Sequence, residues 1–85
     1  MWVIPAVLCG CWGSPVSQDA SCAAYVTCVK ALDTRDGEET NVARFVEGGY
    51  CWKNPTLADG CIQACTKGLK WLRERDAAAP LECQP

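Results

Sequence analysis

Residues 54–77 read NPTLADGCIQACTKGLKWLRERDA, and this stretch decides the fold because its apolar residues recur at helical spacing. Asn54 is the expected N-cap, and Pro55 occupies the first helical position, where proline loses no hydrogen bond. The apolar stripe consists of Leu57, Cys61, Cys65, Leu69 and Leu72. The opposite, polar face consists of Gln63, Thr66, Lys67, Lys70, Arg73 and Glu74. The pattern predicts an amphipathic helix from Pro55 to about Ala77, with Gly68 at a close approach to a neighbouring helix.

A second helix is predicted from Ser17 to about Asp33, with Ser17 as its N-cap and Asp19 in its first turn. Its apolar face consists of Cys22, Tyr25, Val26, Val29 and Leu32. Two stripes of matching length in so small a domain can bury only against each other. We therefore expect an all-α fold, a small antiparallel helical hairpin.

The segment between the two helices is expected to be short and irregular or helical. Asn41 to Glu47 is predicted as a short helix, with Asn41 as its cap and with Val42, Phe45 and Val46 on its apolar side. Two glycines, residues 48–49, end it.

The chain contains eight cysteines and no histidine in 85 residues, a composition typical of disulfide scaffolds. Six of them lie in the polar part of the chain: Cys22, Cys28, Cys51, Cys61, Cys65 and Cys83. An apolar core of this size rarely supplies more than about 3–5 kcal/mol, and each disulfide adds about 2–4 kcal/mol. Disulfides persist outside the reducing cytosol. The sequence therefore predicts an exported, disulfide-stapled domain over residues 21–85.

The sequence alone does not select one disulfide pairing. In an antiparallel hairpin the end of the first helix faces the start of the second, which brings Cys28 near Cys61 or Cys65. The tail after Pro80 is long enough to fold back toward Cys22. The expected pairs are Cys22–Cys83, Cys28–Cys65 and Cys51–Cys61. A competing set keeps the first pair and exchanges Cys61 with Cys65.

The remaining two cysteines, Cys9 and Cys11, lie in an uncharged apolar leader, and Asp19 is the first charged residue of the chain. Leu8-Cys9-Gly10-Cys11 resembles the lipobox of bacterial lipoproteins. This resemblance implies a signal peptide over residues 1–10, a lipidated Cys11 and a tether over residues 11–20. It also implies attachment to the outer membrane, because tryptophan and not aspartate follows Cys11. The alternatives are a simple signal peptide or a short buried strand or helix.

The cysteine spacing of residues 22–65 is similar to that of small cysteine-rich lipoproteins of myxobacteria. The shared pattern is Cys-x5-Cys, a long gap, Gly-x-Cys-Trp, and then Cys-x9-Cys-x3-Cys. Because those proteins are mostly uncharacterised, the resemblance implies a compartment and a fold but no activity.

Catalytic and nucleic-acid-binding classes are disfavoured. Without histidine, Ser-His-Asp and Cys-His centres are excluded, and a net charge of −2 with no basic run argues against nucleic acid.

The loop acids Asp33, Asp36, Glu38 and Glu39 suggest either a weak calcium site or, as we favour, a solvated loop. If reduced, Cys28, Cys51, Cys61 and Cys65 would suit a soft metal, whereas the spacing Cys61-x3-Cys65 differs from the Cys-x2-Cys motif of thiol–disulfide catalysts. The favoured interpretation has no metal and no cofactor.

We therefore expect a non-catalytic, lipid-anchored envelope domain that binds an unidentified protein or envelope component or has a structural role. The alternative is a fully secreted effector or inhibitor, and an enzyme or metal carrier forms a third class. Tyr50, Trp52 and Trp71 are the candidate binding patch. Aromatic residues beside disulfides in small domains more often belong to the core, which is the competing interpretation.

Overall fold

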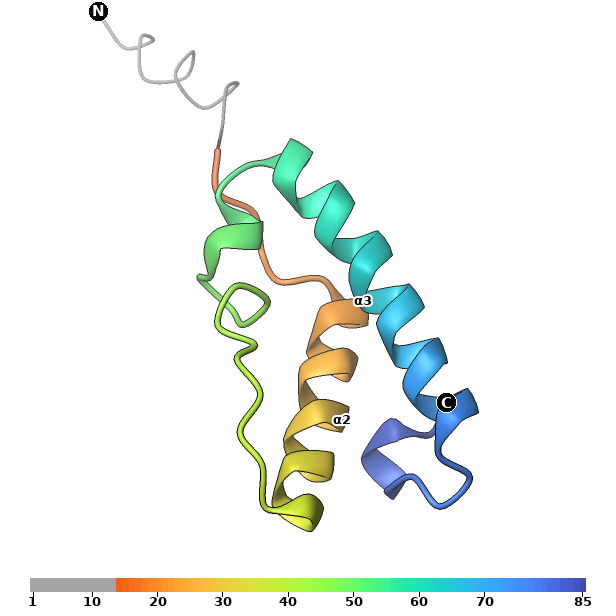
Figure 1. Cartoon of the computed structure of the whole chain (residues 1–85). Helices are drawn as coiled ribbons and strands as arrows, with labels where there is room; N and C mark the ends of the chain where they lie inside the picture. The colour runs from red at the N-terminus through yellow and green to blue at the C-terminus, as the bar shows by residue number, and fades with distance from the viewer. Residues whose placement is uncertain (1–13) are drawn as a thin grey trace, which may run out of the picture.

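The computed structural model describes residues 14–85, and it is all-helical with three disulfides (Figure 1). Helices α2 (Ala20–Asp36) and α3 (Pro55–Arg75) are accompanied by two 3-10 turns, η1 (Tyr50–Trp52) and η2 (Leu81–Cys83). No strand occurs in this part of the chain. The predicted class, an all-α fold stapled by disulfides, is confirmed. The predicted signal peptide, the lipobox and Cys11 lie outside the described residues.

Helix α2 begins and ends later than predicted. Its N-cap is Asp19, whose carboxylate accepts from the backbone N–H of Ser21 at 2.9 Å, so the prediction of Ser17 as the cap is wrong. The helix continues past Asp33 because it ends at a glycine cap: Gly37 has a φ of 69° and donates its N–H to the carbonyl of Asp33. A φ in this left-handed region favours glycine.

Helix α3 begins as predicted. The side chain of Asn54 accepts from the N–H of Leu57 at 2.9 Å, and Pro55 is the first helical residue. The helix ends at Arg75, short of Ala77, because Asp76 adopts an extended conformation and its carboxylate accepts from the N–H of Ala78 at 3.0 Å. The buried residues of α3 are Ala58, Cys65, Leu69 and Leu72.

The two helices run in the same direction, so the prediction of an antiparallel hairpin is wrong. Cys22 near the start of α2 is bonded to Cys65, and Arg35 near its end pairs with Asp76 just after α3. Contacts therefore advance along both helices together. The connector, residues 37–49, returns along α2 before α3 begins (Figure 1). Extended chain rises about 3.3 Å per residue and a helix about 1.5 Å, so this short segment can retrace the whole helix.

The connector contains turns and no helix, so the prediction of a helix from Asn41 to Glu47 is wrong. The amide group of Asn41 accepts from the N–H of Ala43, and the carbonyl of Arg44 accepts from the N–H of Cys51. These contacts replace the hydrogen bonds that a helix would need. The apolar residues still face inward as predicted, because Val42 is buried and Phe45 and Val46 pack against the core.

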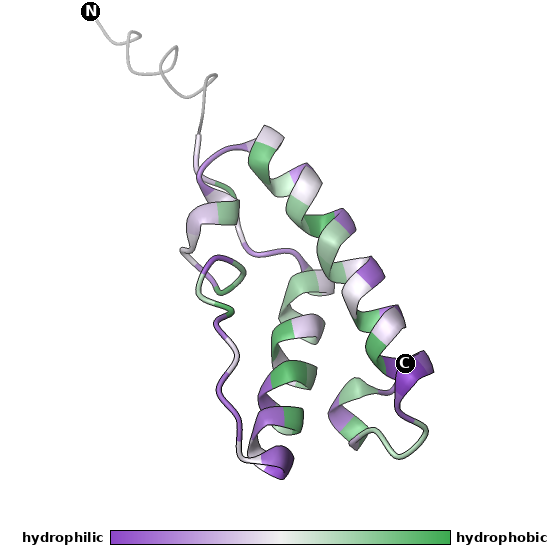
Figure 2. Cartoon of the chain, in the orientation of Figure 1, coloured by the Kyte–Doolittle hydropathy of each residue, from purple (hydrophilic) through white to green (hydrophobic). Residues whose placement is uncertain are grey.

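The core has two neighbouring parts, each built around disulfides. The part near the start of the helices contains Cys22, Cys51, Trp52, Ala58 and Cys65. The other contains Val26, Cys28, Val29, Leu32, Val42, Leu69, Leu72 and Cys83. Figure 2 shows hydrophobic residues recurring along both helices between hydrophilic ones. The turn η2 packs against α2, where Cys83 is bonded to Cys28.

Gly68 lies where α3 approaches α2 closely, as predicted. A β-carbon at this position would lie 2.8 Å from Cε1 of Tyr25, closer than such atoms normally approach. The Tyr25 ring in turn packs edge-on against Phe45, with ring centroids 5.5 Å apart. The glycine therefore makes room for an aromatic side chain that joins both helices and the connector.

Candidate functional site

All six cysteines of residues 14–85 are disulfide-bonded, as Cys22–Cys65, Cys28–Cys83 and Cys51–Cys61. The pair Cys51–Cys61 was predicted. The predicted pairs Cys22–Cys83 and Cys28–Cys65 are wrong, and so is the competing set. Parallel helices place the start of α2 beside the middle of α3, and the tail returns from the end of α3 to the middle of α2. The prediction failed because it assumed the opposite helix direction.

The disulfides occupy every thiol that the soft-metal alternative required. Cys28, Cys51, Cys61 and Cys65 belong to three different disulfides, so none of them keeps a free thiol. Within residues 14–85 there is no group of three or more histidine, cysteine, aspartate or glutamate residues suited to a metal ion. The role of these cysteines in the described part is therefore cross-linking.

The carboxylates of the acidic loop already have partners within the chain. Asp33 accepts from the N–H of Thr40 at 2.7 Å and from its hydroxyl at 2.9 Å. Asp36 pairs with Arg35, whose Nε lies 2.8 Å from it. The calcium alternative thus loses two of its candidate ligands to other contacts, and Glu38 and Glu39 are exposed.

The three residues of the candidate aromatic patch are not brought together. Trp52 is 2% exposed, and its indole N–H donates to the carbonyl of Phe45 at 3.1 Å. Tyr50 and Trp71 are each 56% exposed, but Tyr50 belongs to η1 and Trp71 to the second half of α3. They line different hollows of the surface. Trp52 is therefore a core residue. Contrary to the prediction, Trp71 does not lie beside Tyr50 and Trp52 but has other neighbours.

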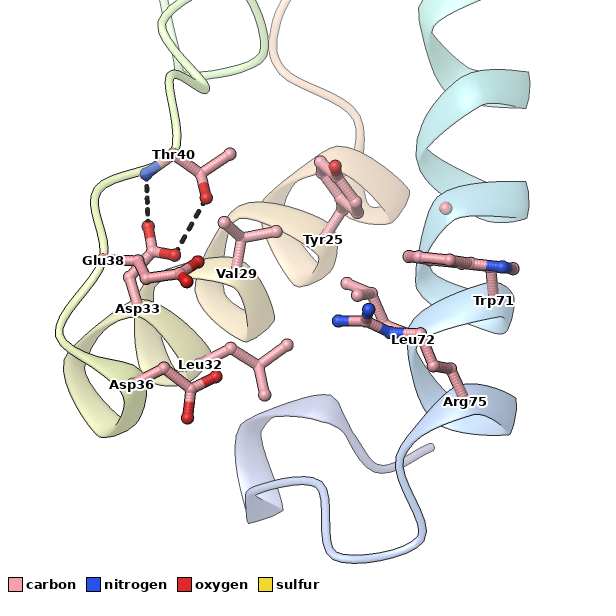
Figure 3. A pocket seen from close by; sticks show the side chains of 11 residues that line it. Tyr25, Val29, Leu32, Asp33, Asp36, Glu38, Thr40, Trp71, Leu72 and Arg75 are labelled. Carbon is pink, nitrogen blue, oxygen red and sulfur yellow. Dashed lines mark hydrogen bonds between the residues drawn. The ribbon is translucent and has the colours of Figure 1, made fainter.

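Those neighbours form a groove of about 240 Å³ between the second halves of α2 and α3, which we call the interhelical groove (Figure 3). Its apolar lining comes from both helices: Tyr25, Val29, Leu32 and Leu72. Its acidic wall lies at the end of α2 and the start of the connector: Asp33, Asp36 and Glu38. Trp71 and Arg75 form the facing wall, and Gly68 and Thr40 complete the lining.

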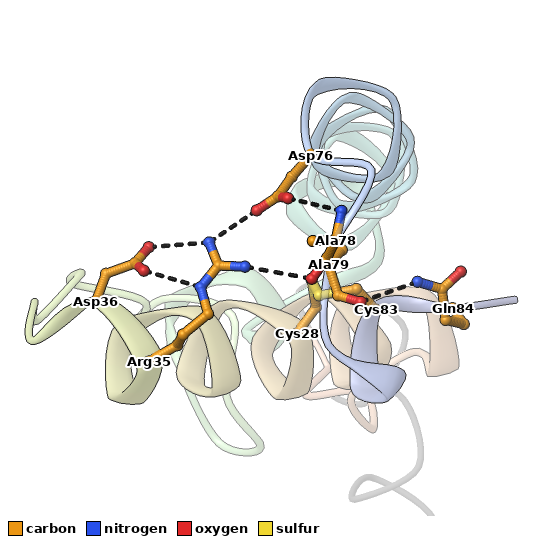
Figure 4. Close-up of polar contacts among 8 residues, drawn as sticks. All are labelled: Cys28, Arg35, Asp36, Asp76, Ala78, Ala79, Cys83 and Gln84. Atoms are coloured by element: carbon orange, nitrogen blue, oxygen red, sulfur yellow. Dashed lines mark hydrogen bonds and ion pairs between the residues drawn. A yellow bond between two sulfur atoms is a disulfide. The ribbon is translucent and has the colours of Figure 1, made fainter.

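The charges around the groove are fixed by local contacts (Figure 4). The hydrogen bond from Arg35 holds the pKa of Asp36 below its ordinary value, and the same guanidinium lowers the pKa of Asp76, together with the N–H of Ala78. Both carboxylates therefore stay ionised at neutral pH. On the facing wall the Arg75 guanidinium lies 4.5 Å from the centroid of the Trp71 ring. No carboxylate of residues 14–85 forms an ion pair with Arg75.

Sequence reasoning identified Trp71 and the loop acids separately but not the groove that they share. It also missed Arg75 and the apolar lining as site residues. An antiparallel arrangement would have placed the end of α2 far from Trp71. One local signal was present, because Trp71 and Arg75 are spaced i, i+4 on a helix and such side chains are neighbours.

Comparison of the chain with protein-family models, with curated proteins and with solved structures gave no match. Among residues 14–85, no helix has the length and apolar character needed to cross a membrane.

Proposed function

We propose that this protein is a non-catalytic, lipid-anchored protein of the bacterial outer membrane whose disulfide-stapled domain has a binding role. The observation that carries the proposal is the cysteine pairing. The six cysteines of the domain are bonded to one another. No thiol of the domain is left as a partner for Cys9 or Cys11, which supports a separate role for the lipobox-like segment. Its resemblance to bacterial lipoproteins assigns Cys11 as the lipidated residue.

The residues just before α2 are held against the domain, so a tether from Cys11 would end before Val16. The N–H of Val16 donates to the carbonyl of Trp52 at 2.8 Å, and the side-chain amide of Gln18 donates to the carbonyl of Phe45 at 2.9 Å. The described chain thus begins beside η1, near the start of α3 (Figure 1). The interhelical groove lies along the second halves of the helices, toward the opposite end of the domain from Val16.

The carboxylates of the groove favour binding over catalysis. A general acid or base works best with a pKa near the operating pH, whereas the contact with Arg35 lowers the pKa of Asp36. Asp33 is engaged by Thr40. The sequence contains no histidine to take over this task. A groove with fixed charges and an apolar lining is suited to holding a ligand.

The test is an intact mass of the natural mature protein together with its membrane partitioning. We expect an N-terminal Cys11 carrying lipid, and six oxidised cysteines. Cys11→Ser should abolish incorporation of radiolabelled palmitate and release the protein from the membrane fraction. Cys9→Ser is the matched control, because it removes a neighbouring thiol but leaves the lipidated residue. A soluble, unacylated mature chain would overturn the anchor and favour the secreted alternative.

A further inference from the structure

We propose that the interhelical groove receives a lysine side chain of a partner protein. The inference rests on the binding role proposed above and specifies its ligand chemistry, but it does not depend on the lipid anchor. It follows from three properties of the groove: its size, its apolar lining and the arrangement of charge on its two walls.

The size of the groove suits one side chain. Pockets for drug-sized ligands measure about 300–1,000 Å³, and this groove, at about 240 Å³, is smaller. Val29, Leu32 and Leu72 are buried and supply carbon surface from both helices, with the half-buried Tyr25 ring beside them. A lysine carries four methylene groups that pack on such surface while its ammonium group reaches a polar rim.

The charge of the groove favours a cation. Asp33, Asp36 and Glu38 line one side of the groove, and Arg75 lies on the other side (Figure 3). Asp36 is already paired with Arg35, which leaves the carboxylates of Asp33 and Glu38 on this wall. Asp33 is hydrogen-bonded to the uncharged Thr40, and neither Asp33 nor Glu38 has an ion pair among residues 14–85. Glu38 is therefore the expected partner of the ammonium group, and Asp33 adds negative charge beside it.

The wall formed by Trp71 and Arg75 determines on which side of the groove the lysine ammonium group lies. Arg75 extends from α3, on the side of the groove opposite Glu38, and its guanidinium lies over the Trp71 ring. A second cation is repelled from that wall and attracted to the acidic one. The exposed ring of Trp71 remains at the rim, where it can contact the backbone of the partner on either side of the lysine.

The probe is the blocked tripeptide acetyl-Gly-Lys-Gly-amide, titrated into the ¹⁵N-labelled mature protein and followed by NMR. We expect shifts of the Glu38, Thr40 and Gly68 amides and of the Trp71 indole. The norleucine tripeptide has a similar stem without the charge and should bind more weakly. Equal binding of the two peptides, or shifts confined to other residues, would show that the groove does not recognise lysine.

Two opposite charge variants make the test specific. Glu38→Gln should weaken binding of the lysine peptide by about two- to five-fold, the range for an exposed ion pair. Arg75→Gln should strengthen it by a similar factor, because the guanidinium opposite the acidic wall is removed. Glu39→Gln is the matched control, since it removes the same charge from the next residue, which does not line the groove.

The outcomes separate this inference from the proposed anchor. A weaker complex with Arg75→Gln would indicate an anionic guest, and the absence of any saturable binding would overturn the inference whether or not Cys11 is acylated. If the natural mature chain binds lysine but is not acylated, the lysine site would be supported and only the lipid anchor would be overturned. The three variants alter exposed side chains, and an unchanged NMR spectrum outside the groove verifies that each remains folded.

Discussion

Arg35, in the last turn of α2, donates from Nη2 to a carboxylate oxygen of Asp76, the C-cap of α3, at 2.7 Å (Figure 4). The same guanidinium pairs with Asp36 and reaches the carbonyl of Ala78 at 3.4 Å. One side chain therefore ties together the ends of both helices and the turn that begins the tail. Only helices that run in the same direction can bring these residues together.

This cluster predicts a specific dependence of stability on pH. Arg35 lowers the pKa of Asp36 and of Asp76 in the folded chain. A carboxylate with a lowered folded pKa contributes stability above its unfolded pKa, about 3.9, and that contribution is lost as the pH falls through the folded pKa. When the pH falls from neutral to below about 4, the free energy of unfolding should therefore decrease less in Arg35→Gln than in the parent chain. Urea unfolding at several values from neutral to strongly acidic pH measures the difference. Parallel curves for the two proteins would contradict it.

The two glycines of α3 are expected to respond differently to alanine. A β-carbon at Gly60 has no neighbour within 4 Å, so Gly60→Ala should stabilise the fold by about 0.5–1 kcal/mol through helix propensity. At Gly68 the added methyl group would press on Tyr25, and overpacking costs about 1–3 kcal/mol. Gly68→Ala should be at least about 1 kcal/mol less stable than Gly60→Ala by denaturant unfolding. Equal stabilities would mean that Tyr25 moves aside freely.

Adjacent residues on opposite faces of α3 test its packing. Leu69 is 7% exposed, and Leu69→Asp should destabilise the domain by several kcal/mol, on the order of 3, because it buries an unpaired carboxylate. Lys70 is exposed and forms only a weak pair with Glu74 at 3.9 Å. Lys70→Asp should cost no more than about 1 kcal/mol, for the lost pair and the new repulsion. Comparable losses of stability in the two variants would contradict the assignment of Leu69 to the buried face of α3 and of Lys70 to the exposed face.

The disulfide pairs can be mapped on unreduced protein by cleavage and mass spectrometry. Cleavage after Tyr25 separates Cys22 from Cys28, which trypsin leaves on one peptide because no lysine or arginine lies between them. The peptide containing Cys83 should be linked to the fragment with Cys28 and not to that with Cys22. A link from Cys83 to Cys22 would support an antiparallel arrangement instead.

Local structure was largely determined by the sequence. The Asn54 cap, Pro55 at the first helical position and the apolar spacing of α3 act within a turn or two, so they identify the helix without its neighbours. The same holds for the apolar side of the connector and for the nearby pair Cys51–Cys61. The start of α2 was predicted two residues too early, because serine and aspartate are both good N-caps and the structure uses Asp19 in place of Ser17.

The direction of the helices, two of the disulfides and the interhelical groove were decided only by the tertiary structure. An amphipathic stripe specifies which face of a helix is buried, and it serves equally well for a parallel or an antiparallel neighbour. The choice depends on how the connector returns along α2 and on where Tyr25 fits beside Gly68, which are contacts between residues distant in the chain. Once the direction is set, Cys28 faces the returning tail and Glu38 lies across the groove from Arg75.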